Sequence, residues 1–257
     1  MKNVNVLTLK LGKGTAAKDS RTLMLSSILT TELPPIPEVY DFDRGRSKIP
    51  TPMFKNDVHG DCVIAGRAHQ TIRFERMEQR KTLNISDADV VDEYFRQTKG
   101  ADSGLIVLRS LKQWRNEGWT AAGNRYTIAA FAKLKHLDRG DVRASIFLLS
   151  GLGCGILLPL TAQAQFAAGK PWDVVPDAPD GQGNRGSWGG HYVYCHAYNK
   201  TGPVCVTWGR KQQITWAFWD KYCDEAYGIV DGLNKWRAGK PGIDVARLEK
   251  LLADIQR

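Results

Sequence analysis

The chain has 257 residues, of which 42% are hydrophobic and 25% charged, as in globular proteins that bury a sizeable core. Its net charge of +9 includes no block of five or more like charges, so we expect an ordinary basic surface and no nucleic-acid partner. Five cysteines without a CxxC pair indicate neither a disulfide framework nor a zinc knuckle, and we expect no metal and no cofactor.

One stretch, residues 144–168, carries no charge and calls for comparison with a membrane span. Three glycines and a proline interrupt it, and its strongly apolar pieces are only about four residues long, far shorter than a spanning helix. The first 25 residues contain neither a secretory apolar region nor a cleavage site. We therefore expect no membrane segment and a cytoplasmic location.

Residues 1–50 are predicted to form an N-terminal arm that lies along the surface of the main body. Residues 19–25 favour a short helical turn, and three prolines within residues 34–37 favour an extended segment and exclude a helix there. Residues 43–48 form a polar loop. A flexible tail is the alternative interpretation of the arm.

Helical periodicity characterises the next part of the chain. Apolar positions at near-helical spacing predict a central helix over residues 61–79. Ser86 and Asp89 match a capping box and predict the start of a second helix. A third helix is predicted over residues 103–116, with Gly118 as its stop.

The second half of the chain changes to strands. The sequence predicts strands at residues 125–131, 154–160, 191–198, 203–208 and 226–230, and helices at residues 141–149, 215–222 and 244–255. Between them, residues 169–190 are rich in Gly, Pro and Asp and predict a long loop.

A cysteine and a histidine stand where catalysis could use them. Cys62 follows a small turn at the start of the central helix, where backbone N–H groups favour a thiolate. His191, 129 residues later, opens a β-branched and aromatic run and could take the thiol proton. A buried structural role is the alternative for each, and His196, on the opposite face of the same strand, is the rival base. The other four cysteines are expected to be small buried hydrophobes.

An attacked carbonyl also needs hydrogen-bond donors for its developing negative charge. The backbone N–H of Cys62 is one candidate donor. The side-chain amide of Asn56, six residues upstream, is the other.

These features together resemble the papain-like cysteine peptidases. Asn56 stands where that family has an amide six residues before the nucleophile, and Gly60 matches its glycine two residues before it. Residues 191–198 are similar to the family's His-Ala-Val-x-x-Val-Gly-Tyr strand, and residues 206–209 to its Asn-Ser-Trp-Gly motif. The Gly-Asp-Cys sequence resembles the divergent bacterial and phage members, which implies possible association with a virion.

The resemblance covers roughly residues 50–231 and implies an α+β fold, with a helical N-terminal half that carries the cysteine helix, an antiparallel β C-terminal half and a cleft between them. We assign residues 1–50 to the arm, 51–235 to a papain-like catalytic domain and 236–257 to a C-terminal helical extension. The arm is shorter than the family's inhibitory propeptide but long enough to cross the cleft.

The chain departs from the family at the histidine-orienting position. Alignment on Trp208 places Val206 where the family has Asn, and Thr207 is the nearest polar substitute, although adjacent strand residues point to opposite faces. The orienting group would then be Thr207, come from elsewhere or be missing. Trp188 and Trp208 would wall the cleft or pack in the core.

The resemblance implies a thiol hydrolase that cleaves peptide or amide bonds, with a peptide or protein substrate. Cys62 would be the nucleophile, His191 the base and then the acid, and Asn56 part of the oxyanion site. The missing orienting Asn leaves a second hypothesis, a catalytically silent binding or structural module, and a third, transfer or deamidation by the same dyad.

Overall fold

The computed structural model describes residues 6–46 and 48–256, so residues 1–5 of the predicted arm and Ser47 of the predicted polar loop lie outside the described residues. Within the described ranges, seven strands form one antiparallel sheet in the order β4-β9-β5-β6-β7-β8, with β1 also paired to β6. These strands are β1 (Tyr40–Asp41), β4 (Ala130–Lys133), β5 (Leu152–Leu158), β6 (Gly189–Tyr198), β7 (Pro203–Thr207), β8 (Arg210–Gln213) and β9 (Cys223–Val230).

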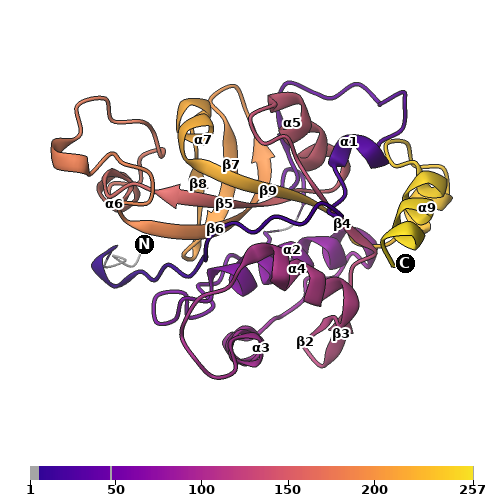
Figure 1. The fold of residues 1–257 in the computed structure, drawn as a ribbon, viewed down its shortest axis with the longest axis horizontal. Coiled ribbons are helices and arrows are strands. Elements are labelled where there is room, and N and C mark those ends of the chain that lie inside the picture. The colour runs from indigo at the N-terminus through magenta and orange to yellow at the C-terminus, as the bar shows by residue number, and fades with distance from the viewer. Residues whose placement is uncertain (1–5, 47, 257) are drawn as a thin grey trace.

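Helices cover both faces of this sheet (Figure 1). The described helices are η1 (Val6–Thr8), α1 (Leu25–Ile28), α2 (Cys62–Glu78), α3 (Asp87–Thr98), α4 (Val107–Asn116), α5 (Arg139–Leu148), α6 (Thr161–Ala167), η2 (Pro179–Gly181), α7 (Trp216–Tyr222), α8 (Asn234–Arg237) and α9 (Val245–Gln256). A separate hairpin of β2 (Trp119–Ala121) and β3 (Asn124–Tyr126) lies beside α3.

Two hydrophobic cores lie on the two faces of the sheet, because side chains alternate along each strand. Tyr192 of β6 and Ile229 of β9 pack with the apolar faces of α2, α3 and α4. Val193 and Val230, the next residues along the same strands, pack in the other core with α5 and α7. The result is the predicted α+β architecture, with a helical N-terminal half and a strand-rich C-terminal half.

Local signals explain the first two long helices. The predicted helix over residues 61–79 is α2, and the capping box of Ser86 and Asp89 is present at the start of α3. The third helix starts at Val107, four residues later than predicted, because Gly104 has a φ of 73° and Leu105 is paired with the N-terminal segment. The predicted start at residue 103 is therefore wrong.

Other predicted boundaries changed where long-range pairing decides them. The single strand predicted over residues 125–131 is wrong: the segment divides between β3 and β4, which belong to different sheets. The helical turn predicted at residues 19–25 lies instead at α1, whose Leu25 and Ile28 are buried. Strand β8 and helix α6 were not predicted.

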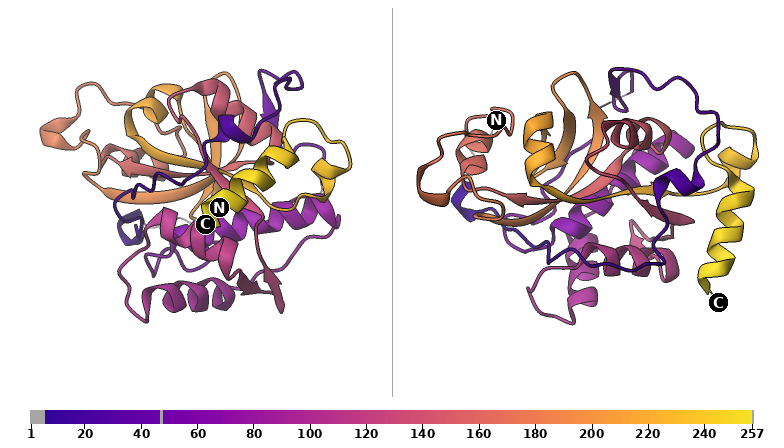
Figure 2. Two further views of the ribbon diagram at one scale, coloured as in Figure 1. Left: turned by 45° about the vertical axis from the view of Figure 1, so that its right-hand side comes forward. Right: turned by 45° about the horizontal axis from the view of Figure 1, so that its top comes forward.

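The N-terminal segment passes between the sheet and helices α2 and α4 before it reaches α1 (Figures 1 and 2). The chain then returns to the sheet at β1, which pairs with the end of β6. At the other terminus, α9 lies against α1 at one end of the molecule. Its Leu248 is buried in the same core as Val193 and Val230. Among the described residues, no helix combines the length and apolar character that crossing a bilayer requires.

Candidate active site

Cys62 is the first residue of α2 and is held there by a fixed turn. The backbone N–H groups of Val58 and His59 both donate to the carbonyl of Lys55. The N–H of Gly60 donates to a carboxylate oxygen of Asp102 over 2.9 Å. These bonds place the sulfur at the helix N-terminus, where the helix dipole favours a thiolate.

His191 lies near the start of β6 and its ring is held on two sides. The ring of Trp208 stacks on it, with centroids 4.0 Å apart and planes within 13°. The hydroxyl oxygen of Thr207 lies 2.7 Å from Nε2. Trp208 has a φ of 41°, unusual for a residue with a side chain, in the turn between β7 and β8. In the part of the chain that the structure describes, Nδ1 has no hydrogen-bond partner.

The fold brings Cys62 next to the backbone of the His191 segment. The N–H of Tyr192, which belongs to the peptide bond after His191, points to the Cys62 sulfur at 3.4 Å. No hydrogen bond between that sulfur and the His191 ring occurs among the described side chains. The Cys62 sulfur therefore contacts the main chain next to His191, whereas the His191 ring itself is held by Thr207 and Trp208.

Asn56, the predicted oxyanion donor, is buried beside this turn. Its side-chain N–H donates to the carbonyl of His59 over 3.1 Å, so the amide stabilises the turn in this structure. The backbone carbonyl of Asn56 accepts a hydrogen bond from the backbone N–H of Lys10. The oxyanion role of Asn56 stays a prediction.

The N-terminal segment, residues 10–14, covers the candidate site. Its main chain is hydrogen-bonded to both halves of the fold. On the helical side, Lys10 N donates to Asn56 O, Gly14 N to Leu105 O and Leu105 N to Gly12 O. On the sheet side, Lys13 N donates to Gly190 O and Trp208 Nε1 to Lys10 O. Gly12 lies so close to the cysteine turn that a Cβ atom there would be 1.6 Å from the Gly60 oxygen. The site is consequently occupied by the protein's own main chain.

Burial sets the protonation of the covered pair. It raises the pKa of the Cys62 thiol to about 12, against the opposing effect of the Tyr192 and Gly12 N–H groups. Burial likewise lowers the pKa of His191 to about 3. Both side chains are only 1% exposed. Beneath the N-terminal segment, the pair is therefore a neutral thiol and a neutral imidazole.

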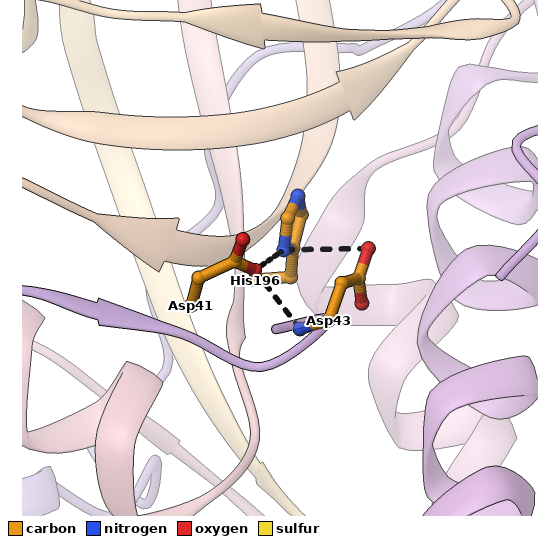
Figure 3. A group of neighbouring side chains, drawn as sticks. All are labelled: Asp41, Asp43 and His196. Atoms are coloured by element: carbon orange, nitrogen blue, oxygen red, sulfur yellow. Dashed lines mark hydrogen bonds and ion pairs between the residues drawn. The ribbon is translucent and has the colours of Figure 1, made fainter. Parts of the chain in front are cut away.

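The rival base His196 belongs to a different cluster, shown in Figure 3. Its Nδ1 lies 3.2 Å from Asp41 and 3.7 Å from Asp43. These three residues are close enough to share a cation. Asp43, however, already pairs with Arg73 and Lys211, each at 2.7 Å, so protein cations neutralise it. We interpret the group as an ion-pair network that fixes β1 on β6 and α2.

Sequence reasoning missed an acidic site beside the candidate dyad. Lys13 of the N-terminal segment inserts its ammonium group between Asp224 and Glu225 of β9. The only signal in the sequence is the placement of Lys13 between two glycines, which lets the main chain lie close to its surroundings. The rings of the predicted wall residues Trp188 and Trp208 pack against each other at a tilt of 32°, with centroids 5.2 Å apart, and Trp208 is almost fully buried.

Comparison with known proteins supports the fold. No protein-family model and none of the curated proteins matches the sequence. Among solved structures, xylellain, a cysteine protease from Xylella fastidiosa, is similar with a TM-score of 0.62 and 14% identity over 88% of this chain and 97% of its own. Procathepsin B S9 from Trypanosoma congolense is similar with a TM-score of 0.60 and 14% identity over 90% of this chain and 91% of its own. The Carica candamarcensis cysteine protease CMS1MS2 is similar with a TM-score of 0.55 and 12% identity over 77% of this chain and 100% of its own.

These similarities extend over most of the chain, and they agree with the element order described above. At 10–14% identity they concern the fold alone. The protein has the fold of the papain-like cysteine proteases.

Proposed function

We propose that the protein is a thiol hydrolase that cleaves peptide or amide bonds with Cys62 as nucleophile and His191 as base. One observation carries the proposal: the Cys62 sulfur, at the N-terminus of α2, contacts the peptide N–H that follows His191, whose Nδ1 is free. A thiol at a helix N-terminus next to an oriented imidazole is the arrangement that activates a cysteine nucleophile.

In the proposed reaction, His191 Nδ1 accepts the proton of the Cys62 thiol and the sulfur attacks the substrate carbonyl carbon. A C–S bond forms, and the carbonyl electron pair moves to the oxygen, near the Cys62 N–H and the Asn56 amide. When the C–N bond breaks, the imidazolium gives its proton to the leaving amine. Water, deprotonated by His191, then attacks the thioester, the C–S bond breaks and the thiol is restored.

Thr207 is proposed as the positioning residue for His191. Its hydroxyl can accept a hydrogen bond from Nε2–H, which fixes the tautomer with an unprotonated Nδ1. This is the task of a third group that orients the base in a catalytic triad. The role that Asn has in the resembling family would thus pass to the hydroxyl one residue closer to Trp208.

Because residues 10–14 cover the site, substrate can enter only when this segment moves away. Opening would let water reach both side chains, which lowers the Cys62 pKa and raises the His191 pKa from their present values. The thiolate–imidazolium pair would then become accessible near neutral pH.

The test uses a chain opened by Gly12→Val, whose added side chain would collide with the Gly60 carbonyl. This chain should hydrolyse members of a peptide library, and an epoxide or iodoacetamide probe should label Cys62 selectively. Cys62→Ala and His191→Ala in the same chain should abolish turnover, whereas the matched core substitution Cys205→Ala should preserve it. Equal labelling of all five thiols, or turnover that survives Cys62→Ala, would contradict the proposal.

A second candidate function is a catalytically silent binding or structural module. The coverage of Cys62 and His191 by the protein's own main chain favours it, because both are only 1% exposed. Lack of turnover in the opened chain on a broad library, with a folded Cys62→Ala variant, would support this alternative. Product mass spectrometry would distinguish hydrolysis from transfer or deamidation. Residence in the cytoplasm or in a virion stays a prediction.

A further inference from the structure

The acidic site beside Cys62 consists of Gly155 on β5 and Asp224 and Glu225 on β9. Lys13 fills it: Nζ lies 2.8 Å from Asp224 Oδ2 and 3.3 Å from Glu225 Oε1, and it also donates to the Gly14 carbonyl. The Lys13 side chain is completely buried, and Glu225 is 1% exposed. The ammonium group is therefore desolvated, and water screens its attraction to the two carboxylates less than it would in an ion pair on the surface.

The shape of the acidic site suits a long, unbranched side chain. Gly155 pairs directly with Glu225 in the sheet, and a Cβ atom on Gly155 would lie 2.0 Å from Cε of Lys13. The missing side chain thus makes room for the aliphatic stem. The hydroxyl of Tyr227 donates to the far oxygen of Glu225 over 3.0 Å and fixes the carboxylate in place.

The charges of the acidic site are not balanced by Lys13 alone. Two carboxylates face one ammonium group, and within the described residues Asp224 Oδ1 has no hydrogen-bond partner. A guanidinium group, with five N–H donors, could use both oxygens of Asp224. The site is therefore suited to lysine and arginine, whereas an apolar side chain would leave the buried Glu225 and the partly buried Asp224 without a cation.

The main chain around Lys13 lies where a substrate would have to lie. Lys13 N–H donates to Gly190 O, directly before His191, and Leu105 exchanges hydrogen bonds with Gly12 and Gly14. Gly12 N–H faces the Cys62 sulfur. A peptide bound in this manner would place its backbone against the nucleophile and one neighbouring side chain in the acidic site.

We propose that Asp224 and Glu225 select substrates with a lysine or arginine close to the cleaved bond, and that Lys13 occupies their position as an internal substrate mimic. The inference rests on the proposed thiol hydrolase function. It adds the substrate class, which neither the Cys62–His191 pair nor the fold defines.

The first experiment needs no catalysis and uses the full chain. Amide hydrogen exchange at Lys13 and Gly14 is compared among the wild-type chain, Lys13→Arg and Lys13→Met. Loss of a hydrogen bond to a charged group should speed exchange in Lys13→Met by about tenfold or more, while Lys13→Arg stays close to wild type. Equal exchange in Lys13→Met and wild type would overturn the charge selectivity of the acidic site.

The second experiment uses a chain that carries both Gly12→Val and Lys13→Ala. It measures the rate at which Cys62 is labelled by two peptidyl chloromethyl ketones, one with lysine and the other with norleucine at the same position. The lysine probe should react about tenfold faster or more, and the isosteric pair Asp224→Asn, Glu225→Gln should remove this preference. Asp177→Asn, an exposed carboxylate, is the matched control and should preserve it.

The outcomes separate the two proposals. Equal rates for both probes, with Cys62 still labelled, would overturn the lysine preference and leave the thiol hydrolase proposal standing. No labelling of Cys62 by either probe or by iodoacetamide would overturn the thiol hydrolase proposal, and the substrate class would fall with it.

Discussion

The Thr207 hydroxyl oxygen lies 2.7 Å from Nε2 of His191, on the side of the ring opposite its free nitrogen. The same ring is stacked against Trp208, the residue that follows Thr207. Two consecutive residues at the end of β7 therefore fix the imidazole by a hydrogen bond and by a ring face. An imidazole held in this manner keeps one tautomer and one orientation, both of which proton transfer requires.

The first prediction concerns this hydrogen bond. In the opened Gly12→Val chain, Thr207→Val should lower kcat/KM by about 10–100-fold, because the ring loses its tautomer control while the volume of residue 207 is kept. Thr207→Ser, which retains the hydroxyl, should recover most of the activity. The pH profile of kcat/KM should also change in Thr207→Val only, since a merely structural defect would not shift it. Equal activity of the Val and Ser variants would contradict a positioning role.

The second prediction concerns access to Cys62. Burial holds the pKa of its thiol near 12, so iodoacetamide, which reacts with the thiolate, should label the wild-type chain slowly at pH 7 and faster as pH rises. Gly12→Val should displace the N-terminal segment and raise the rate at pH 7 by about tenfold or more. The control is Gly232→Val, because a Cβ atom at Gly232 meets nothing within 4 Å. Similar labelling rates in both variants would show that residues 10–14 do not limit access.

Local sequence signals predicted the elements that depend on few partners. The helix after Cys62 and the capping box of Ser86 needed only spacing and end residues, and the structure confirms both. The segment of residues 125–131 failed because its two parts join different sheets. Alternation of side chains predicts which face a residue occupies, but pairing with distant strands decides where a strand begins and ends.

The candidate site shows the same division between local and distant information. Cys62 and His191 were suggested by short motifs, and the structure brings the Cys62 sulfur to the N–H of Tyr192, the residue after His191, while the catalytic pairing of the two side chains stays a prediction. Strand alternation placed Val206 and Thr207 on opposite faces, but it could not show which of them meets His191. The contact between Lys13 and Asp224 joins residues 211 positions apart, and no local pattern contains it.

The third prediction concerns Asp61, the residue before the nucleophile. Burial raises the pKa of its carboxyl to about 8, with the Asn56 amide opposing, so the folded state holds a proton that the unfolded chain releases near pH 4. Between these pH values the unfolded state binds fewer protons than the folded state. The free energy of unfolding should therefore fall by up to about 1.4 kcal/mol for each unit by which the pH rises.

Asp61→Asn should remove this dependence, because the amide carries no charge at any pH. Urea unfolding should show that the free energy of unfolding of Asp61→Asn exceeds that of wild type by more at pH 8 than at pH 5. A matched control is Asp177→Asn at an exposed position, which should leave the Asp61 dependence in place. If the free energy of unfolding changes equally with pH in Asp61→Asn and in wild type, Asp61 is ionised in the folded protein and the prediction is wrong.

The fourth prediction concerns the ion-pair network of Asp43. Although burial alone would raise it, the hydrogen bonds and charge of Arg73 lower the pKa of Asp43 to about 2. Asp43 therefore stabilises the fold above the carboxyl's ordinary pKa of 3.8, and this contribution is lost as pH falls toward 2. Arg73 is completely buried, so Asp43→Ala should cost about 3 kcal/mol at pH 7 by leaving its guanidinium without that partner.

Urea unfolding at pH 7 and at pH 3 measures both parts of this prediction. The difference between Asp43→Ala and wild type should shrink at pH 3, since the carboxyl of the unfolded wild-type chain, with its ordinary pKa of 3.8, takes up a proton there while the folded chain keeps Asp43 mostly ionised. Asp177→Ala, at an exposed position, should differ from wild type by less than about 0.5 kcal/mol at either pH. A loss in Asp43→Ala that is equally large at both pH values would assign the effect to packing of β1 on β6 and α2, and not to charge.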